Sequence, residues 1–555
     1  MRVKRSIVAA MVGTLAVTGL AACSSSGGSA GSANTAAVLN VGMPDGPQSE
    51  NNNPFLQTSA ATNLGYRFMI YEPLVMLNDI KPAEPGKPWL ATKWDWSDNY
   101  SKLVLTIRDG VKFSDGTPMT AADVAYTFQL LKDNASLNID AVPFKDITTT
   151  GNTVTLGFAA SQFVNQVKIL RQVIVPKHIW STYASPTTEV VKNPIGTGPY
   201  TLKSFSTQTV TITRRDGYWQ NEPEVKEIHY TSYTDNNSQT AALVSGAADW
   251  SFVFIPNAKA VFTGKDPAHY KLFFPPVLAV HGLWFNTTTA PYNNPALRQA
   301  ISKVLNRDDI FNQGEAGYFY PKVDNVTGIP TPAGDSFIAQ KYQGKIITPD
   351  VAAAKATLTA AGFTYQGTKL IDPTGKPVTL KLTVPSGWSD YITDLTIIKD
   401  NVSGIGIDAS VTTMNQDAWT KSVDTGQFDA IMHWTDPGAT PYDIYKDAMS
   451  GDLFKPIGTG GTTGNYGRYQ NPDATAALAT YANAADAPSR TAAMEKLQDI
   501  MVQQQPMVPT SAGNEGGEYS TKHWTGWPDE NNQYGPAQPT LRNALDIVLH
   551  LKAAS

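Results

Sequence analysis

The chain has 555 residues, of which 41% are hydrophobic and 16% charged, and its formal net charge is −5 at neutral pH. These are the values of an ordinary globular protein, and the mildly acidic, mixed charge gives no reason to expect nucleic acid or anionic lipid as a partner. After the N-terminal segment, no apolar run approaches the ~18 residues of a membrane span.

The first segment has the features of a secretory signal. A positive n-region (2–5) precedes an apolar stretch (7–20), and small residues lead up to Cys23. The apolar stretch is too short to span a bilayer permanently. The string LAAC, which ends at Cys23, also resembles the lipobox of bacterial lipoproteins. This resemblance implies a signal peptide over 1–22 and a diacylglycerol on the Cys23 thiol.

Lipidation at Cys23 would place the protein outside the cytoplasm, anchored to the cell membrane. The alternative is an incidental thiol in an ordinary cleaved signal peptide. Cys23 is the single cysteine of the sequence, so its lipidation leaves no disulfide, redox pair or thiolate metal site. The residues of 23–37 that follow it are small and polar, which predicts a flexible tether between the lipid and the fold.

From residue 38 onward the sequence predicts a mixed α/β fold. Alternating strands and amphipathic helices follow one another without a regular βα period or an internal repeat. Residues 103–107 predict a strand and 108–110 a turn, after which 111–113 predict a short returning strand and 114–116 a second turn. Thr120 then caps a helix with Asp123 at its N3 position. The buried face of this helix is expected to contain Val124, Phe128 and Leu131.

The second half of the chain has comparable local signals. Residues 351–362 predict a helix that ends at a glycine, Gly362. Residues 372–375 (DPTG) predict a hairpin turn, and 378–384 alternate like a strand. These signals favour a compact α/β unit in this region.

Six segments together resemble one known family. Residues 103–131 (LVLTIRDGVKFSDGTPMTAADVAYTFQLL) look like the signature of family 5 extracytoplasmic solute-binding proteins, the large receptors of ABC importers. Such receptors take oligopeptides, oligosaccharides, nickel chelates or haem. Further family segments follow in the expected order at 194–200 (PIGTGPY), 214–219 (RRDGYW), 246–250 (GAADW), 285–310 and 465–478. The resemblance covers nearly the whole mature chain.

The resemblance implies a two-lobed, periplasmic-binding-protein-like fold of the class II type, with an extra sub-domain in lobe one and a ligand cleft between the lobes. The expected segments are 38–280 with a C-terminal return at 513–555 for lobe one, about 81–190 for its extra sub-domain, and 283–512 for lobe two. We expect the chain to cross between the lobes near 280–284 and 510–514.

Catalysis is the competing class of function. The one G-x-S-x-G string, at 27–31, lies in the expected tether, where a nucleophile elbow has neither its strand nor its helix. The seven histidines show no H-E-x-x-H pairing, and no P-loop string is present. We expect most histidines at the surface or in the core, with His281 or His433 as candidates to reach the cleft. The sequence therefore predicts no enzyme, no catalytic residue, no cofactor and no metal site.

The 12 tryptophans are the better guide to a ligand, because aromatic faces stack on sugar rings or line apolar pockets. Trp94, Trp96 and Trp219 lie in structural motifs of the family, so we assign them to packing. Trp388 lies in a turn after a strand, where a bulky side chain has less reason to be buried. The expected ligand-binding residues are Trp388, Trp434, Asp436, Trp250 and Trp527.

Residues 428–445 bear on the choice between peptide and sugar. In peptide receptors of the family, the matching loop carries an Asp three residues after the aromatic residue and four before the proline, and its carboxylate pairs with the ligand's α-ammonium. Aligning Trp434 and Pro441 places Pro437 there, with Asp436 one residue early. A buried ammonium needs a carboxylate in good geometry, so the shift argues against a peptide without excluding it.

Residues 385–390 (PSGWSD) and 525–527 (TGW) look like the family's receptors for β-linked oligosaccharides. An oligosaccharide is therefore the favoured ligand and an oligopeptide the alternative. The other expected partners are the permease subunits of an ABC importer, and we expect a monomer that meets the membrane through its lipid. A lipoprotein sensor and a secreted hydrolase are further alternatives; a hydrolase needs an acid/base pair that the sequence does not show.

Overall fold

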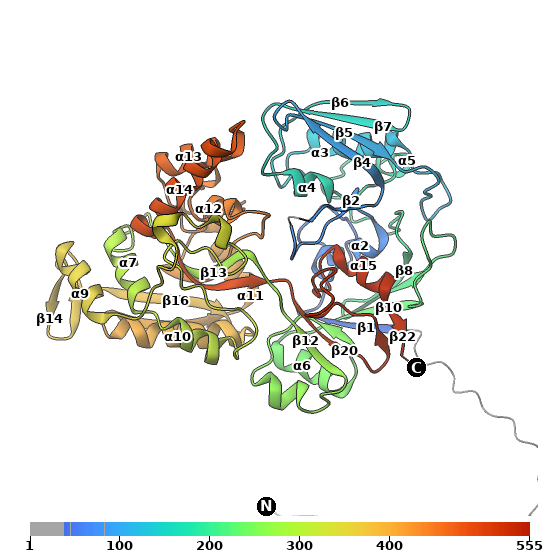
Figure 1. The fold of residues 1–555 in the computed structure, drawn as a ribbon. Coiled ribbons are helices and arrows are strands. Elements are labelled where there is room, and N and C mark those ends of the chain that lie inside the picture. The colour runs from blue at the N-terminus through green and yellow to red at the C-terminus, as the bar shows by residue number, and fades with distance from the viewer. Residues whose placement is uncertain (1–37, 45, 83, 555) are drawn as a thin grey trace, which may run out of the picture. The chain divides into compact units, whose positions relative to one another are not determined.

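The computed structural model describes residues 38–44, 46–82 and 84–554. The expected signal peptide, Cys23 and the tether lie outside these residues. None of the helices within the described ranges is long and apolar enough to cross a membrane. The described part contains two main sheets, which mark the first and second lobes of the fold (Figure 1).

The first lobe is built on a seven-stranded sheet with the order β12-β20-β11-β1-β10-β9-β8. Strand β1 pairs in parallel with β10 and β11, and the other pairs are antiparallel. Buried and half-buried residues alternate along β9 and β10, as a sheet with one face on a core requires. The strands are β1 (Val38–Met43), β8 (Tyr200–Phe205), β9 (Thr209–Arg214), β10 (Glu227–Ser232), β11 (Trp250–Ser251), β12 (Tyr270–Phe273) and β20 (Gly517–Ser520).

A separate antiparallel sheet, with the order β4-β5-β7-β6, lies in the region expected for the extra sub-domain. Its strands are β4 (Ala91–Ser97), β5 (Lys102–Ile107), β6 (Phe144–Thr150) and β7 (Thr153–Phe158). The strand predicted at 103–107 is confirmed as β5. The prediction that residues 111–113 form a returning strand is wrong. This segment does not pair with β5, because β4 and β7 already occupy both edges of β5. This segment instead forms a single bridge, from Lys112 to Pro118.

The helix predicted after this turn is confirmed as α3 (Ala121–Asp133). The Thr120 hydroxyl oxygen accepts the Ala122 N–H at 3.3 Å, and the Asp123 carboxylate accepts the Thr120 N–H at 2.8 Å. This capping box satisfies backbone donors at the helix start, a contribution of about 1 kcal/mol. The predicted inner face is buried as expected, with Val124, Phe128 and Leu131.

The second lobe is built on a five-stranded sheet with the order β17-β16-β18-β13-β19. Strand β16 pairs in parallel with β17 and β18, whereas β13 is antiparallel to β18 and β19. The strands are β13 (Pro276–Phe285), β16 (Thr379–Pro385), β17 (Asp408–Met414), β18 (Ala430–Trp434) and β19 (Val508–Asn514). The strand predicted at 378–384 is confirmed as β16.

The local predictions for this lobe are also confirmed. Helix α9 (Val351–Ala360) is followed by Gly362 at φ +85°, the left-handed conformation that ends many helices. The turn at 372–375 closes with Gly375 at φ +88°, and the Asp372 N–H donates to the Lys376 carbonyl at 2.8 Å. These positions need a glycine because its missing Cβ permits positive φ.

The chain changes from the first sheet to the second between β12 and β13, and returns between β19 and β20. The changes therefore fall at 274–275 and 515–516. The crossings expected at 280–284 and 510–514 lie inside β13 and β19, because these strands pair with each other from Pro276 and Asn514 onward. The lobe boundaries given above stay predictions.

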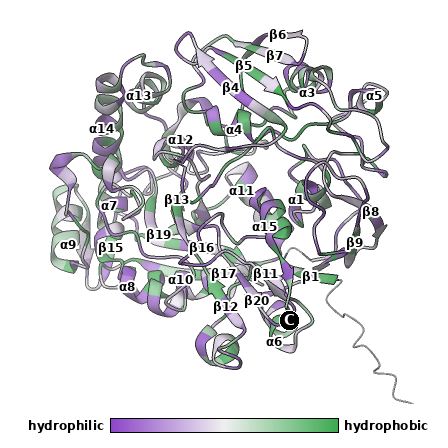
Figure 2. Ribbon diagram, turned by 45° about the vertical axis from the view of Figure 1, so that its right-hand side comes forward, coloured by the Kyte–Doolittle hydropathy of each residue, from purple (hydrophilic) through white to green (hydrophobic). Residues whose placement is uncertain are grey.

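Short helices and small sheets complete both lobes. Hydrophobic and hydrophilic residues are interleaved along the elements (Figure 2). The helices at the first sheet and sub-domain are α1 (Ala60–Asn63), α2 (Arg67–Ile70), α4 (Gln166–Leu170), α5 (Lys177–Trp180), α6 (Asn236–Ser245) and α15 (Asn543–His550). Those of the second lobe are α7 (Pro295–Val304), α8 (Arg307–Asp309), α10 (Ser389–Ser403), α11 (Gln416–Thr425), α12 (Tyr442–Met449), α13 (Pro472–Asn483) and α14 (Ala487–Gln504). The two-stranded pairs are β2 (Val75–Met76) with β3 (Lys87–Pro88), β14 (Thr364–Gln366) with β15 (Lys369–Ile371), and β21 (Trp524–Thr525) with β22 (Lys552–Ala553).

A buried carboxyl group explains why the segment 214–219 ends in two aromatic residues that can donate hydrogen bonds. Glu72 is completely buried and accepts hydrogen bonds from the Tyr218 hydroxyl at 2.6 Å, Trp219 Nε1 at 2.9 Å and Trp89 Nε1 at 2.7 Å. Burial raises the pKa of Glu72, and these donors offset part of that rise. Trp219 therefore packs in the first lobe, as predicted.

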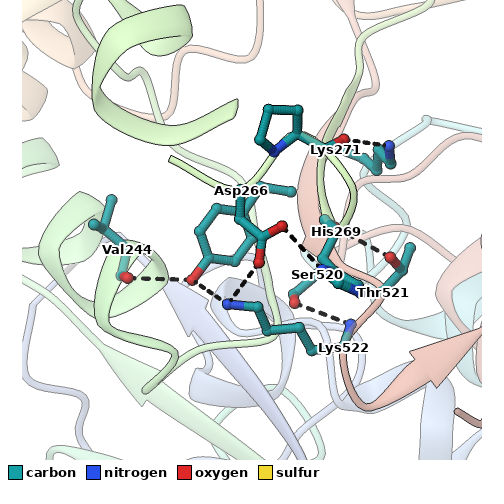
Figure 3. A network of polar contacts seen from close by, with 9 residues as sticks. Val244, Asp266, His269, Lys271, Ser520, Thr521 and Lys522 are labelled. Carbon is teal, nitrogen blue, oxygen red and sulfur yellow. Dashed lines mark hydrogen bonds and ion pairs between the residues drawn. The ribbon is translucent and has the colours of Figure 1, made fainter. Parts of the chain in front are cut away.

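The C-terminal part of the chain is tied to the first lobe by a polar network around Asp266 (Figure 3). Lys522 Nζ lies 3.0 Å from the Asp266 carboxylate and 4.4 Å from the ring centroid of Tyr270. His269 Nδ1 lies 2.9 Å from the other Asp266 oxygen. These groups keep solvent contact, and such exposed ion pairs contribute little to stability. We therefore expect them to hold the loop after β20 in position more than to stabilise the fold.

Candidate functional site

A cavity of about 440 Å³ is lined by residues of both lobes. Phe252, Phe254 and Asn236 line it from the first lobe, and Trp388 and Trp434 line it from the second. Most of its wall is aromatic or apolar, with amide and hydroxyl groups between the rings. This combination is typical of a small-molecule site.

The two tryptophans of the second lobe lie next to each other. Trp388 is half-buried between β16 and α10, and its ring centroid lies 6.1 Å from that of Trp434 and 5.6 Å from that of Tyr391. Trp434 ends β18 and is 37% exposed. Both rings follow the carboxyl ends of parallel strands, the edge where α/β sheets place their ligands. The structure thus places Trp388 and Trp434 on the cavity, and their contact with a ligand is a proposal.

A stack of rings supports Trp434 from behind. The His433 ring lies 4.2 Å from Trp434 at an interplanar angle of 16°, and Trp419 stacks on His433 at 5.6 Å and 13°. Burial lowers the pKa of His433 to about 4, so its imidazole is neutral at physiological pH. The stack therefore orients Trp434 without adding positive charge.

Of the two histidines considered as candidates, His281 lines the cavity and His433 lies behind it. The His281 ring stacks on Tyr320 at 3.9 Å, and its Nδ1 atom makes a hydrogen bond with the Tyr391 hydroxyl. Burial, with a smaller effect of His433, lowers the pKa of His281 to about 3. His281 is therefore neutral as well.

Three carboxyl groups lie together at this wall. Asp390, in the first turn of α10, lines the cavity, and its Oδ1 atom lies 3.4 Å from Asn236 Nδ2. Burial raises the pKa of Asp390 to about 6. Glu315 and Asp394 are completely buried, and burial raises the pKa of each well above its usual range. We therefore expect this neighbouring pair to retain at least one proton at neutral pH.

Sequence reasoning missed these three acids, and it also missed Glu515, which lines the same cavity. Asp390 is the last residue of the segment PSGWSD, but acidic residues are common in the first turn of a helix, so its position did not indicate a binding role. Glu315 and Asp394 are far apart in the chain and carry no motif. Glu515 lies where the chain returns to the first lobe. Its position at this crossing between the lobes is the one sequence signal that could have pointed to it.

Two of the expected ligand-binding tryptophans must be corrected. Trp250 is completely buried in β11, and its Nε1 donates to the Ala537 carbonyl at 2.6 Å. Trp527 packs on Trp250 at 5.3 Å and stacks on Tyr519 at 4.8 Å. Neither lines the cavity, because Trp250 belongs to an interior strand of the first sheet and Trp527 packs against it in the core of the first lobe. We leave both out of the proposed site.

Asp436 is also placed differently from expectation. Its side chain is exposed, its backbone N–H donates to the Asp447 carboxylate at 2.7 Å, and it is not among the residues that line the cavity. Pro437, the neighbour that occupies the expected carboxylate position, does line it. A proline offers no charge to a ligand ammonium.

A second cavity of about 170 Å³ shares Pro437 and Glu515 with the first. On its wall, Lys168 of the sub-domain lies 2.9 Å from Asp443 of α12 and 3.5 Å from Asp140. Burial by itself would lower the pKa of Lys168, but the two carboxylates reverse this effect and raise it. This buried ion pair joins the sub-domain to the second lobe beside the cavity.

In the described part of the chain, no group of three or more His, Cys, Asp or Glu residues is arranged to hold a metal ion.

Known proteins are similar to this chain in sequence and in fold. A profile of the bacterial extracellular solute-binding proteins, family 5 Middle, matches residues 86–452. The nickel-binding periplasmic protein of Escherichia coli is 27% identical over 411 residues, which cover 70% of this chain and 74% of that protein. The glutathione-binding protein GsiB of Salmonella paratyphi A is 26% identical over 431 residues, which cover 76% and 79%.

Solved structures agree on the fold. A mannohexaose-bound periplasmic oligopeptide-binding protein of Thermotoga maritima has a TM-score of 0.81 and 23% identity, and the match covers 94% of this chain and 99% of that one. NikZ of Campylobacter jejuni in complex with Ni(L-His) has a TM-score of 0.76 and 15% identity, with 93% and 99% covered. The chain therefore belongs to family 5 of the bacterial extracellular solute-binding proteins of ABC importers, and it has their two-lobed class II fold.

Proposed function

We propose that this protein is the substrate-binding lipoprotein of an ABC importer, and that it captures a β-linked oligosaccharide in the cavity between its lobes for delivery to the permease. The observation that carries the proposal is the pair of tryptophans, Trp388 and Trp434, on a cavity that also presents amides and hydroxyls. Indole faces stack on the C–H faces of sugar rings, and amides such as Asn236 bond hydroxyl groups.

The charges of the cavity support a sugar over an ordinary zwitterionic peptide. No lysine or arginine is among the residues that line it, within the ranges that the structure describes. A peptide bound whole would leave its α-carboxylate without a cationic partner there, at a considerable cost in desolvation. A neutral oligosaccharide carries no such charge. We also propose that the protein binds its ligand without converting it, because the relatives are binding proteins.

An oligopeptide is the alternative ligand, and Asp390 is the observation that favours it. Its carboxylate lines the cavity and could pair with an α-ammonium, the role that the sequence comparison assigned to another position. Peptide receptors are also among the proteins with this fold, including AppA of Bacillus subtilis, which was solved with a nonapeptide.

The proposal is tested by a thermal-shift screen of the mature protein against cello-, chito-, xylo- and manno-oligosaccharides, with di- to penta-peptides in parallel. A ligand at 100 times its dissociation constant should add ~2.7 kcal/mol to the free energy of unfolding. We expect stabilisation by one sugar series without product formation. Stabilisation by peptides alone would favour the alternative, and cleavage of the ligand would contradict the assignment as a receptor.

The lipid anchor predicts the outcome of one substitution. Replacing Cys23 with serine removes the thiol that would be acylated, so Cys23→Ser should move the protein from the membrane fraction to the soluble fraction without changing its melting temperature. Ser24→Ala, which leaves the thiol in place, is the matched control and should stay with the membrane. A Cys23→Ser protein that remains membrane-bound after a high-salt wash would contradict lipid anchoring.

A further inference from the structure

The acidic wall of the cavity, which consists of Asp390, Glu315 and Asp394, has no cationic partner. Among the residues that the structure describes, none of the three forms an ion pair with a lysine or arginine, and no cation contributes to the shift in any of their pKa values. Asp390 is the member that lines the cavity, and it is 8% exposed. A carboxylate buried to this extent without a counter-charge is costly, unless something else supplies the charge.

The rest of the lining supplies none. The cavity-lining residues include no lysine or arginine in the part of the chain that is described, and His281 is neutral because burial keeps its pKa low. The groups around Asp390 are themselves acidic or neutral. They include Asp394 and Tyr391 on α10, Glu315 beside the second lobe's π-helical turn (Ile310–Gly314), Tyr318 and Tyr320 in the loop that follows, Asn236 on α6 and His281 on β13.

A second, independent group also points to a ligand. Glu515 lines the cavity, is 5% exposed, and its Oε2 atom has no hydrogen-bond partner among the described residues. Burial and Asp79 raise the pKa of Glu515 to about 8, against the opposite effects of Arg542 and Arg171. In the free protein it is therefore mostly a neutral acid that can donate a hydrogen bond into the cavity. Buried polar atoms without partners are rare, so the Glu515 carboxyl group lies at the cavity with an oxygen that the described residues leave unsatisfied.

The aromatic rings add to the same preference. Trp388, Trp434 and Tyr320 line the same cavity as Asp390. Ring faces carry a negative quadrupole and attract cations when water is excluded. Both the carboxylate and the rings thus favour a positive group on the ligand over a negative one.

We propose that Asp390 is an ammonium subsite, and that the ligand is an oligosaccharide with a free amino group, of the glucosamine-oligomer type. The inference rests on the proposed function, since it takes the cavity as a sugar site, and it specifies the sugar class. The protonated amine pairs with the Asp390 carboxylate, and Glu515 donates a hydrogen bond to an oxygen of the same ligand. N-acetylation of the sugar removes the charge and with it the ion pair.

The test compares ligands of equal length by calorimetry with the mature protein at pH 6.5, where most of Asp390 is ionised. The probes are a glucosamine tetramer, the N-acetylglucosamine tetramer, cellotetraose, and a tetrapeptide with a free or an acetylated N-terminus. We expect the glucosamine tetramer to bind at least ~10-fold more tightly than its acetylated form, the scale of a charge-assisted hydrogen bond.

Asp390→Asn should abolish this preference, so that the free and acetylated tetramers bind the variant with equal affinity, because an amide keeps the hydrogen bonds of the carboxylate but not its charge. Asp400→Asn is the matched control: it lies on the same helix, its carboxylate is exposed, and the preference should persist. The melting temperature of each variant shows whether it is folded.

Equal affinity for the free and acetylated tetramers overturns the ammonium subsite, as does a preference that survives in Asp390→Asn, or a failure of the glucosamine tetramer to bind at millimolar concentration. Tighter binding of cellotetraose also overturns it, but leaves the proposed sugar receptor standing. Binding of the free tetrapeptide alone overturns both the amino-sugar ligand and the proposed function.

Discussion

Trp388→Ala is expected to weaken oligosaccharide binding by roughly 1–3 kcal/mol, the scale for removing a large aromatic contact. The indole lines the cavity beside Trp434, so its truncation removes one of two adjacent stacking surfaces. The fold should persist, because Trp388 lies at the start of α10 and is only half-buried. Calorimetric titration with the best sugar from the screen measures the effect.

Trp94→Ala is the matched control for this loss. Trp94 is also half-buried, but it lies in β4 of the sub-domain sheet and does not line the cavity. It should bind sugar like the wild type. If Trp388→Ala also binds like the wild type, Trp388 is not a ligand contact and the sugar proposal loses its main support.

Asp436→Asn should leave sugar affinity unchanged, since the Asp436 side chain lies outside the lining; a severe loss of peptide binding in that variant would restore the peptide alternative.

Gly196→Ala is expected to lower the free energy of unfolding by about 3 kcal/mol, the upper range for overpacking a tight site. A Cβ atom at this position would lie 2.0 Å from the carbonyl oxygen of Ile70 and 2.7 Å from its carbonyl carbon. The obstacle is backbone, and the Ile70 oxygen already accepts the Gly198 N–H at 2.9 Å, so neither side can easily move. The midpoint of denaturant unfolding measures the change.

Gly157→Ala provides the comparison. A Cβ at Gly157, in β7, would meet its nearest atom at 3.5 Å, which is an ordinary contact. We expect a change of no more than ~0.5 kcal/mol there, as is usual for substitutions that disturb no special feature. Equal unfolding midpoints for the two variants would show that the PIGTGPY segment tolerates a side chain and has another reason for its glycines.

Local structure was predictable where the interacting groups are close in sequence. The capping box of α3 joins Thr120 to Asp123, three residues apart, so its pattern is visible without the fold. The glycines after α9 and in the 372–375 turn likewise reflect a backbone conformation of their own residue. The short return at 111–113 failed for the opposite reason, because its pairing depended on β4 and β7, which occupy the edges of β5.

The tryptophans show where such reasoning stops. Trp388 and Trp527 both lie in turn-like segments that resemble oligosaccharide receptors, yet Trp388 lines the cavity and Trp527 packs against Trp250 in the core. Whether an indole faces solvent or core depends on what the neighbouring strands place over it. That information is distributed along the chain and is not contained in the local pattern.

The sequence by itself determined the family, the two-lobed class and the expectation of a lipid anchor, because ordered motifs and local conformational signals need no knowledge of distant contacts. Only the tertiary structure decided which side chains meet at the cavity. It moved Trp250 and Trp527 into the core, left Asp436 outside the lining, and brought Asp390 together with Glu315, Asp394 and Glu515. The physical reason is that burial, and the charge environment that burial creates, arise from residues far apart in the chain that meet only when the lobes have folded.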